Sequence, residues 1–255
     1  MIFCAIKEFV GKFKPSRIKK IFFLSRKLRP YISKVKPELI KNGFTKISSY
    51  NRLTWKYYGS DRIRFTLLGY KHGKKYVIKF AKGFDEKMNN SIFLQSKFND
   101  VFDFIPKGGE FVLNGYKCYY TEFVDSNSFS FAMKTANGEL VDELIHQANC
   151  ILDALNTYKI VHCDLEEVNI LVEKTSNKIY LIDWDTVCSS QLGLSCTAFP
   201  DCTIKKRVEK ETIYDDAYSF STLFKRYVKN DILYNNFNFN SIEEKIGRNV
   251  HVVRE

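Results

Sequence analysis

The sequence predicts an α+β chain of two lobes, preceded by a basic helical arm. Residues 53–82 and 111–124 are rich in aromatic and β-branched side chains and are divided by turn residues, which is typical of antiparallel strands. Residues 137–160 and 215–228 instead place apolar side chains at helical spacing. We therefore expect a basic amphipathic arm at 1–36, a small antiparallel β-sheet lobe with one helix at 37–122, and a mostly helical lobe at 123–255.

The composition is that of a globular protein in a reducing compartment. With 255 residues and a hydrophobic content of 45%, the chain is long enough to bury a substantial core. Its seven cysteines are odd in number and include no Cys-x-x-Cys pair, so neither a disulfide framework nor a zinc site is expected. No apolar run approaches the ~20 residues of a membrane span, and the N-terminus lacks the apolar core of a secretory signal. These features predict a cytoplasmic protein.

The arm at 1–36 carries almost all of the excess positive charge. It holds eleven Lys and Arg residues and one acid, Glu8, whereas the whole chain has a formal net charge of +11. Large apolar residues are interspersed at roughly helical spacing, and Pro15 and Pro30 are expected to break the arm into short helices. Basic amphipathic helices lie on anionic membrane surfaces, which predicts a peripheral position on the inner face of the cell membrane. A helix packed on the domain with its charges solvated is the alternative, and nucleic acid is the least favoured partner.

The sheet lobe is expected to hold five strands and one helix. Its segments are separated by turns that contain glycine and aspartate, and Asn114-Gly115 is a strong hairpin signal. The predicted strands are 53–58, 63–70, 74–82 and a pair within 111–124, and the predicted helix is 86–99.

The second lobe is expected to begin with a long helix at 137–160. Two short apolar runs follow, at 169–172 and 179–182, and they predict adjacent strands. Residues 215–228 predict another helix, and a mostly helical tail is expected after it. The apolar face of the first helix would be formed by Leu140, Leu144, Ala148, Ile151, Leu152 and Leu155.

Three oxygen-bearing side chains surround the two short strands. Asn169 opens the first strand, Asp183 follows the second, and Asp164 lies just upstream. Burying carboxylates is costly, so this grouping calls for a chemical reason. Phosphoryl transfer from a nucleotide supplies one, because metal ions must neutralise charge on the phosphoryl oxygens and an acidic group must orient the acceptor hydroxyl. Carboxylate and amide oxygens are the hard ligands that Mg²⁺ prefers.

The same residues carry a family resemblance. The stretch "HCDLEEVN" (162–169) resembles the catalytic loop H-R-D-L-x-x-x-N of protein kinases, and "DWD" (183–185) stands where D-F-G would stand. Upstream, "VIK" (77–79) resembles the V-A-I-K strand, and downstream, "DAYSF" (216–220) resembles the D-x-W-S-F-G helix start. The resemblance covers roughly residues 53–228 and implies the bilobal fold of the protein-kinase-like superfamily, with ATP and Mg²⁺ as cofactors.

The resemblance implies a role for each matching residue. Asp164 would orient and deprotonate the acceptor hydroxyl, and Asn169 and Asp183 would bind Mg²⁺. Lys79 would hold the α- and β-phosphates of ATP. The remaining implied residues are Gly59 and Ser60 in the turn that covers the phosphates, Glu122 and Val124 as nucleotide contacts at the hinge between the lobes, and His162 and Asp216 as structural support of the catalytic loop.

Several features depart from the protein-kinase pattern. Cys163 replaces the arginine that would hold a phosphorylated activation loop, and no A-P-E follows, so control by phosphorylation of that loop is not expected. Glu166 stands where many protein kinases have a lysine, and the glycine-rich loop is nearly missing. The acid that would pair with the lysine stays open between Glu86, near the start of its helix, and Asn90 or Gln95 in the matching turn.

The sequence favours a kinase for small molecules. The segment "IDWD" (182–185) resembles that of lipopolysaccharide-core sugar kinases, aminoglycoside phosphotransferases and choline kinases. The leading interpretation is an ATP-dependent kinase for a hydroxyl of a sugar or glycan, including a glycolipid acceptor in lipopolysaccharide or other cell-envelope polysaccharide synthesis. A protein Ser/Thr kinase is the second interpretation, weakened by Glu166. A pseudokinase that acts as a binding or scaffold module is the third, and the retained catalytic and metal-binding positions argue against it.

Overall fold

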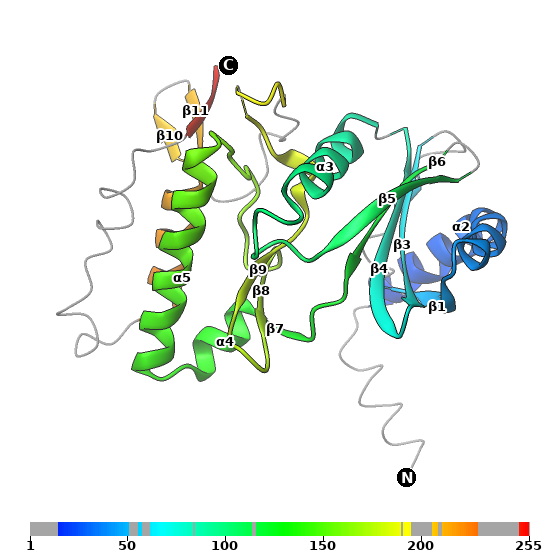
Figure 1. Cartoon of the computed structure of the whole chain (residues 1–255), viewed down its shortest axis with the longest axis horizontal. Helices are drawn as coiled ribbons and strands as arrows, with labels where there is room; N and C mark the ends of the chain where they lie inside the picture. Colours follow the sequence, from blue (N-terminus) through cyan, green and yellow to red (C-terminus); the bar gives the residue numbers. More distant parts are fainter. Residues whose placement is uncertain are drawn as a thin grey trace, which may run out of the picture. The chain divides into compact units, whose positions relative to one another are not determined.

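The chain folds into two compact units. Unit 1 comprises Met1–Asp85 and Gly108–Phe123, and unit 2 comprises Glu86–Lys107 and Val124–Glu255. Figure 1 shows the helices and strands of the two units. The structure is a computed structural model that describes residues 15–50, 56–57, 62–83, 85–113, 116–189, 191–194, 206–208, 211–228 and 250–254.

Unit 1 is built on a six-stranded antiparallel sheet. The strands lie in the order β1-β3-β4-β6-β5, and β2 also pairs with β3. The predicted strands at 63–70 and 74–82 and the hairpin within 111–124 are confirmed, whereas the first strand was not expected. The hairpin turn at 114–115 and most of 53–58 lie outside the described residues. The strands are β1 (Thr45–Ser49), β2 (Lys56–Tyr57), β3 (Ile63–Lys71), β4 (Lys74–Lys82), β5 (Gly108–Leu113) and β6 (Tyr116–Glu122).

Alternation along β3 and β4 builds the core of unit 1. Phe65 and Phe80 are opposite each other in the register, fully buried, and stacked with their ring centroids 4.8 Å apart. Because successive side chains of a strand point to opposite faces, Lys79 lies on the other face of β4 from Ile78 and Phe80. Burial of the aromatic face therefore fixes which face carries the lysine.

A single long helix, α2 (Pro15–Lys41), packs on this core, and the predicted break at Pro30 is wrong. Pro30 lacks an amide hydrogen and cannot donate to the carbonyl of Arg26, an interruption that typically costs ~3 kcal/mol. Both residues are exposed, so water can reach that carbonyl, while burial on the opposite side of the helix offsets the cost. The side chains of α2 that enter the core are Leu24, Leu28, Val35 and Leu39.

The part of the arm that belongs to α2 is therefore better described as a helix packed on the domain than as a helix that lies on a membrane through its apolar side. The remaining residues of the arm, 1–14, lie outside the described residues. None of the described helices is long and apolar enough to cross a membrane.

Unit 2 holds four α-helices and two small sheets within its described residues. The predicted helices at 86–99, 137–160 and 215–228 and the two short strands are confirmed. The predicted helical tail is wrong where it can be checked, because the last described residues form a strand. The helices are α3 (Asp85–Phe98), α4 (Phe129–Thr135), α5 (Gly138–Thr157) and α6 (Asp216–Tyr227); the strands are β7 (Ser126–Ser128), β8 (Ile170–Glu173), β9 (Ile179–Leu181), β10 (Lys206–Val208), β11 (Glu211–Asp215) and β12 (Val250–Arg254).

Helix α3 differs in its packing from the sequence prediction. It was expected to lie in the sheet lobe, but Leu94 and Phe98 belong to the core of unit 2, where they join the buried face of α5. Phe98 stacks on Phe102 with ring centroids 4.7 Å apart, which ties the helix to the segment after it. The fold class is confirmed: an α+β chain with an antiparallel sheet and several helices, consistent with the bilobal kinase-like fold.

Truncation of Leu28 tests the role of α2. Leu28 is fully buried, so Leu28→Ala should destabilise the protein by about 2–5 kcal/mol through lost burial and the cavity left behind. Phe22→Ala on the same helix is the matched control, because Phe22 is 74% exposed. Urea denaturation should show a large loss for the first variant and little for the second. Equal and small effects would mean that α2 does not contribute to the core.

Candidate active site

The short ribbon of β8 and β9 sets the geometry of the site. Ile170 is opposite Leu181 in the antiparallel register, and one step outward the amide of Ile182 donates to the carbonyl of Asn169 at 3.0 Å. Asn169 and Asp183 therefore lie at the same end of the ribbon, as the sequence predicted. Asn169 directly precedes β8, and Asp183 follows β9 after one residue. In both strands every second side chain is buried, and this burial fixes which face of each strand points into the core.

Asn169 also holds Asp164. Its amide nitrogen donates to the Asp164 carboxylate at 3.0 Å and to the Asp164 carbonyl at 2.8 Å. With the nitrogen turned to Asp164, the Oδ1 atom of Asn169 is the one suited to bind a cation. Asn169 is buried, whereas Asp164 and Asp183 are half-buried and can be reached by solvent. One buried amide therefore joins the catalytic candidate to the metal-binding candidates.

Two residues of the site adopt a left-handed backbone. Asp183 has φ 66° and ψ 57°, and Cys163 has φ 62°. Residues other than glycine rarely adopt such angles, which cost about 1–3 kcal/mol and cluster at functional sites. Hydrogen bonds across the two segments hold them in place: His162 Nε2 donates to the Ile182 carbonyl at 3.1 Å, and Thr186 Oγ1 donates to the His162 carbonyl at 3.1 Å.

Asp216 contacts the backbone of the catalytic loop. Its carboxylate accepts from the His162 amide at 2.7 Å and also from the amide of Cys163. The pKa of Asp216 is raised from 3.8 to about 7, mainly by burial and in smaller part by the neighbouring Asp215, while the hydrogen bonds from the two amides act in the opposite direction. Asp215 itself caps α6 by accepting from the Tyr218 amide at 3.0 Å. The start of α6 thus supplies one carboxylate to its own helix and one to the loop.

His162 and Cys163 point inward. The His162 ring is fully buried, with its centroid 4.4 Å from that of Trp184. Cys163 is buried as well, and its Sγ lies 3.3 Å from the Sγ of Cys188, whose backbone pairs with Val161. The residue that replaces the expected arginine therefore packs within the fold.

Sequence reasoning missed the contact of α3 with this segment. Ser91 Oγ donates to the Asp185 carboxylate at 2.6 Å, and Asn90 Nδ2 donates to the Val187 carbonyl at 3.1 Å. The second aspartate of "DWD" was the only available signal, because nothing local to 90–91 indicates a partner 94 residues away in the chain. These bonds join the first half of α3 to the residues that follow Asp183.

Asn90 and Gln95 were the alternatives to Glu86 for the position of the acid that should pair with Lys79. Gln95 Nε2 donates to the carbonyl of Pro106 at 2.8 Å and to the Asn99 side chain at 2.9 Å. Both amides thus bond within unit 2, and the side chain of Glu86 lies outside the described residues.

The other predicted nucleotide contacts lie mainly in unit 1. Lys79 is half-buried with its Nζ 5.4 Å from the centre of the Tyr119 ring, and Glu122 forms an ion pair with Lys74 at 2.6 Å. The chain passes into unit 2 between Phe123 and Val124, in the segment where the resemblance implies the hinge. Gly59 and Ser60 lie outside the described residues. The structure therefore brings together Asp164, Asn169, Asp183, His162 and Asp216 within one unit.

The donor set of unit 2 fits Mg²⁺ held together with a nucleotide. The described residues contain no group of three or more His, Cys, Asp or Glu side chains that could hold a metal ion alone. Mg²⁺ is usually bound through one or two carboxylates together with substrate phosphates and water, and not by an all-protein cage. The carboxylate of Asp183 and Oδ1 of Asn169, at the same end of the ribbon, suit that arrangement.

Comparison with known proteins found one family. The model of the RIO domain matches residues 116–192, which is less than a third of the chain and includes the catalytic loop and Asp183. None of the curated proteins compared with the chain matches it. RIO domains are an atypical protein-kinase-like family, so the match and the fold together make the chain kinase-like. They do not support the narrower likeness to small-molecule and glycan kinases.

The buried carboxyl of Asp216 predicts a pH effect on stability. Because its folded pKa lies above the usual value of 3.8, the folded state binds this proton more tightly than the unfolded state. The contribution of Asp216 to the free energy of unfolding should therefore fall as pH rises from about 4 to about 7 and stay constant above. In Asp216→Asn, denaturation at several pH values should show this decline removed.

Asp142→Asn, which removes an exposed carboxyl on α5, is the control for the loss of an acid in the same unit. If both variants changed the pH profile equally, the assignment of the decline to Asp216 would be wrong.

Proposed function

We propose that the chain is an ATP- and Mg²⁺-dependent phosphotransferase whose acceptor is a hydroxyl group of a protein. The observation that carries the proposal is the double hydrogen bond of the Asn169 amide to Asp164, at the end of the ribbon where Asp183 also lies. In this arrangement the half-buried carboxylate of Asp164 would face the acceptor hydroxyl. The side-chain oxygens of Asn169 and Asp183 would bind a cation that also binds the phosphates.

The residues then divide the chemistry of transfer. Asp164 would accept the proton of the acceptor hydroxyl while the acceptor oxygen bonds to the γ-phosphorus of ATP. The bond from the γ-phosphorus to the β,γ-bridging oxygen would break, and ADP would leave with that oxygen. Asn169 and Asp183 would hold Mg²⁺, which would neutralise charge on the phosphate oxygens. The resemblance of residues 77–79 to the V-A-I-K strand gives Lys79 the role of binding the α- and β-phosphates. The hydrogen bond from Asn169 keeps the Asp164 carboxylate in one orientation before the acceptor arrives.

The match to the RIO domain favours a protein acceptor over a sugar. It covers the catalytic loop and also residues 182–185, whose resemblance to sugar kinases had favoured a sugar acceptor. Burial raises the pKa of Glu166, which stands where many protein kinases have a lysine, although Arg226 acts against that rise. Glu167 forms an ion pair with Arg226 at 3.4 Å.

Substitution of the two aspartates tests the chemistry. Asp164→Asn should lower phosphoryl transfer to generic protein substrates by about 10²–10⁴-fold, because it removes the base while its side-chain oxygen can still accept from Asn169. Binding of ATP with Mg²⁺, measured by thermal shift, should remain. Asp183→Asn should weaken that Mg²⁺-dependent shift as well. Transfer of labelled phosphate from ATP is the direct measurement.

Asp142→Asn serves as the control for both variants, since its carboxyl is exposed on α5. Wild-type turnover in both site variants would refute the catalytic assignment. If the wild-type protein phosphorylates sugars but no protein, the acceptor class is wrong while the site stands. A wild-type protein that shows no shift with ATP and Mg²⁺ would be a pseudokinase.

Activity should not depend on phosphate in the segment between Asp183 and Asp216. Cys163, at the position of the phosphate-binding arginine, is buried against Cys188 and cannot reach a surface phosphate. Phosphatase treatment should therefore leave the transfer rate unchanged. A large loss of rate would mean that another basic residue, such as Lys205 or Arg207, binds such a phosphate.

A further inference from the structure

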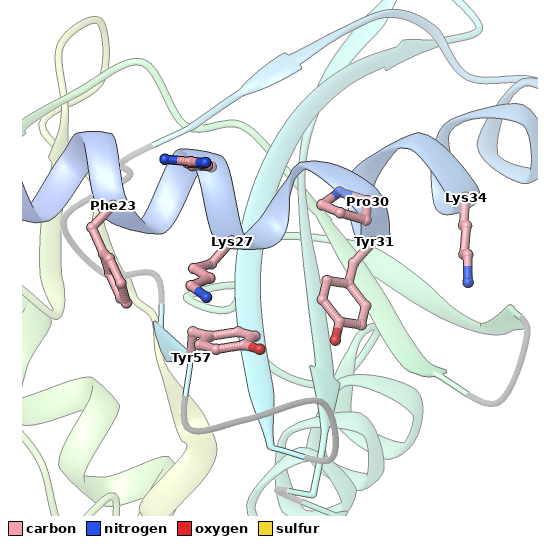
Figure 2. A pocket seen from close by; sticks show the side chains of 7 residues that line it. Phe23, Lys27, Pro30, Tyr31, Lys34 and Tyr57 are labelled. Carbon is pink, nitrogen blue, oxygen red and sulfur yellow. The ribbon is translucent and has the colours of Figure 1, made fainter.

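Helix α2 and strand β2 form a pocket on unit 1. Its volume is about 690 Å³, within the range of small-molecule sites. Figure 2 shows the side chains of Phe23, Lys27 and Tyr31 extending from the helix toward Tyr57 on the strand. The pocket is lined by Phe23, Arg26, Lys27, Pro30, Tyr31, Lys34 and Tyr57.

The helix presents this pocket beside its buried face. Phe23, Lys27, Pro30 and Lys34 follow one another at intervals of three or four residues, so they lie along one stripe of α2. The neighbouring stripe, which includes Leu24 and Leu28, is buried in the core of unit 1. The apolar side of α2 is thus buried against the sheet. The side that a ligand could contact carries cationic and aromatic side chains.

All the charged side chains that line the pocket are cationic. Arg26, Lys27 and Lys34 are exposed, and within the part of the chain that the structure describes none of the three forms an ion pair. No acidic residue occurs between Glu8 and Glu38. An anion is therefore the ligand that the pocket fits, and phosphate suits a mixed set of arginine and lysine donors.

Aromatic rings hold one of these charges in position. The Nζ of Lys27 lies 5.9 Å from the ring centres of both Phe23 and Tyr57, within the range of a cation–π contact. Tyr31 lies beside Tyr57, with ring centroids 6.4 Å apart. Because the ammonium group lies over the Tyr57 ring, this face is better suited to a phosphate at the ammonium than to a stacked nucleic-acid base.

Exposed phenylalanines indicate where the phosphate comes from. Phe22 is 74% exposed, and Phe23, which lines the pocket, is 54% exposed. Aromatic side chains beside lysine and arginine on one side of a helix are typical of segments that lie in the headgroup boundary of a membrane. A soluble phosphate would leave these two rings in water.

We propose that the α2–β2 pocket binds the phosphate headgroup of an anionic phospholipid, with Phe22 and Phe23 entering the boundary of the bilayer. Unit 1 would then dock on a membrane through a folded pocket, and not through an arm that lies free on the surface. The proposal concerns unit 1 alone and does not depend on phosphoryl transfer.

Vesicle co-sedimentation of the full chain tests the pocket. The wild-type protein should sediment with vesicles of equimolar phosphatidylcholine and phosphatidylglycerol, and only weakly with phosphatidylcholine alone. Lys27→Gln/Lys34→Gln should lower the affinity about tenfold or more, since each cation near an anionic surface contributes about 1 kcal/mol. The matched control is Arg29→Gln/Lys36→Gln, which removes the same charge from exposed positions of α2 outside the pocket and should cost no more than about threefold.

Salt separates the aromatic contribution from the ionic one. The charges are screened within ~8 Å at physiological ionic strength, whereas apolar contact persists as salt rises. Phe22→Ala/Phe23→Ala should therefore lower the binding that remains at high salt. All substituted residues are exposed, so thermal shift with ATP and Mg²⁺ should be the same in every variant.

Three results would overturn the proposal. Equal losses in the two double variants would reduce the effect to general charge attraction. Binding of inorganic phosphate that needs Lys27 and Lys34, without vesicle binding, would make the ligand a soluble phosphate. Binding of single-stranded RNA that needs the same residues, again without vesicle binding, would make it a nucleic acid. A chain shortened to Val35 is not a suitable test, because it would remove Leu24 and Leu28 from the core.

Discussion

The antiparallel pairing of β8 with β9 is the constraint on which the candidate site depends. The register places Asn169 next to Ile182, and the hydrogen bond between their backbones leaves Asp183 at the same end of the ribbon. The side chain of Asn169 then orients Asp164, which belongs to the preceding loop. A slip of one residue would turn every strand side chain to the opposite face and separate these oxygens. Burial of Ile170, Val172, Ile179 and Leu181 opposes such a slip.

Around this ribbon, buried polar groups hold backbone segments that are not in regular structure. The Asp216 carboxylate binds the amides of the catalytic loop, Thr186 binds the His162 carbonyl, and Ser91 binds Asp185. Each of these groups would be costly to bury without its partner. They also hold Cys163 and Asp183 in left-handed conformations that the chain would otherwise avoid. Hydrogen bonds from α3 and from the start of α6 therefore hold the site together with those of the loop itself.

In unit 1, one helix serves two surfaces. The apolar stripe of α2 completes the core over the sheet, which explains why the helix continues through Pro30. The stripe beside it gathers cations and aromatic rings at β2. A basic amphipathic sequence is compatible with a membrane surface and with a domain surface, since the pattern records only that one side is apolar. The structure assigns the apolar side to the domain and leaves the cationic side exposed.

The sequence by itself determined the elements whose signals are local. Aromatic and β-branched side chains between turn residues predicted β3 and β4, and helical periodicity predicted α5 and α6. The spacing of Asp164, Asn169 and Asp183 around two apolar runs predicted a phosphoryl-transfer site. The tertiary structure decided what periodicity cannot encode. The assignment of α3 to unit 2, the bond from Ser91 to Asp185, the continuity of α2 and the strand β12 all depend on partners distant in the chain. Their free energies come from burial and hydrogen bonds that exist only after those distant segments meet, so no local pattern records them.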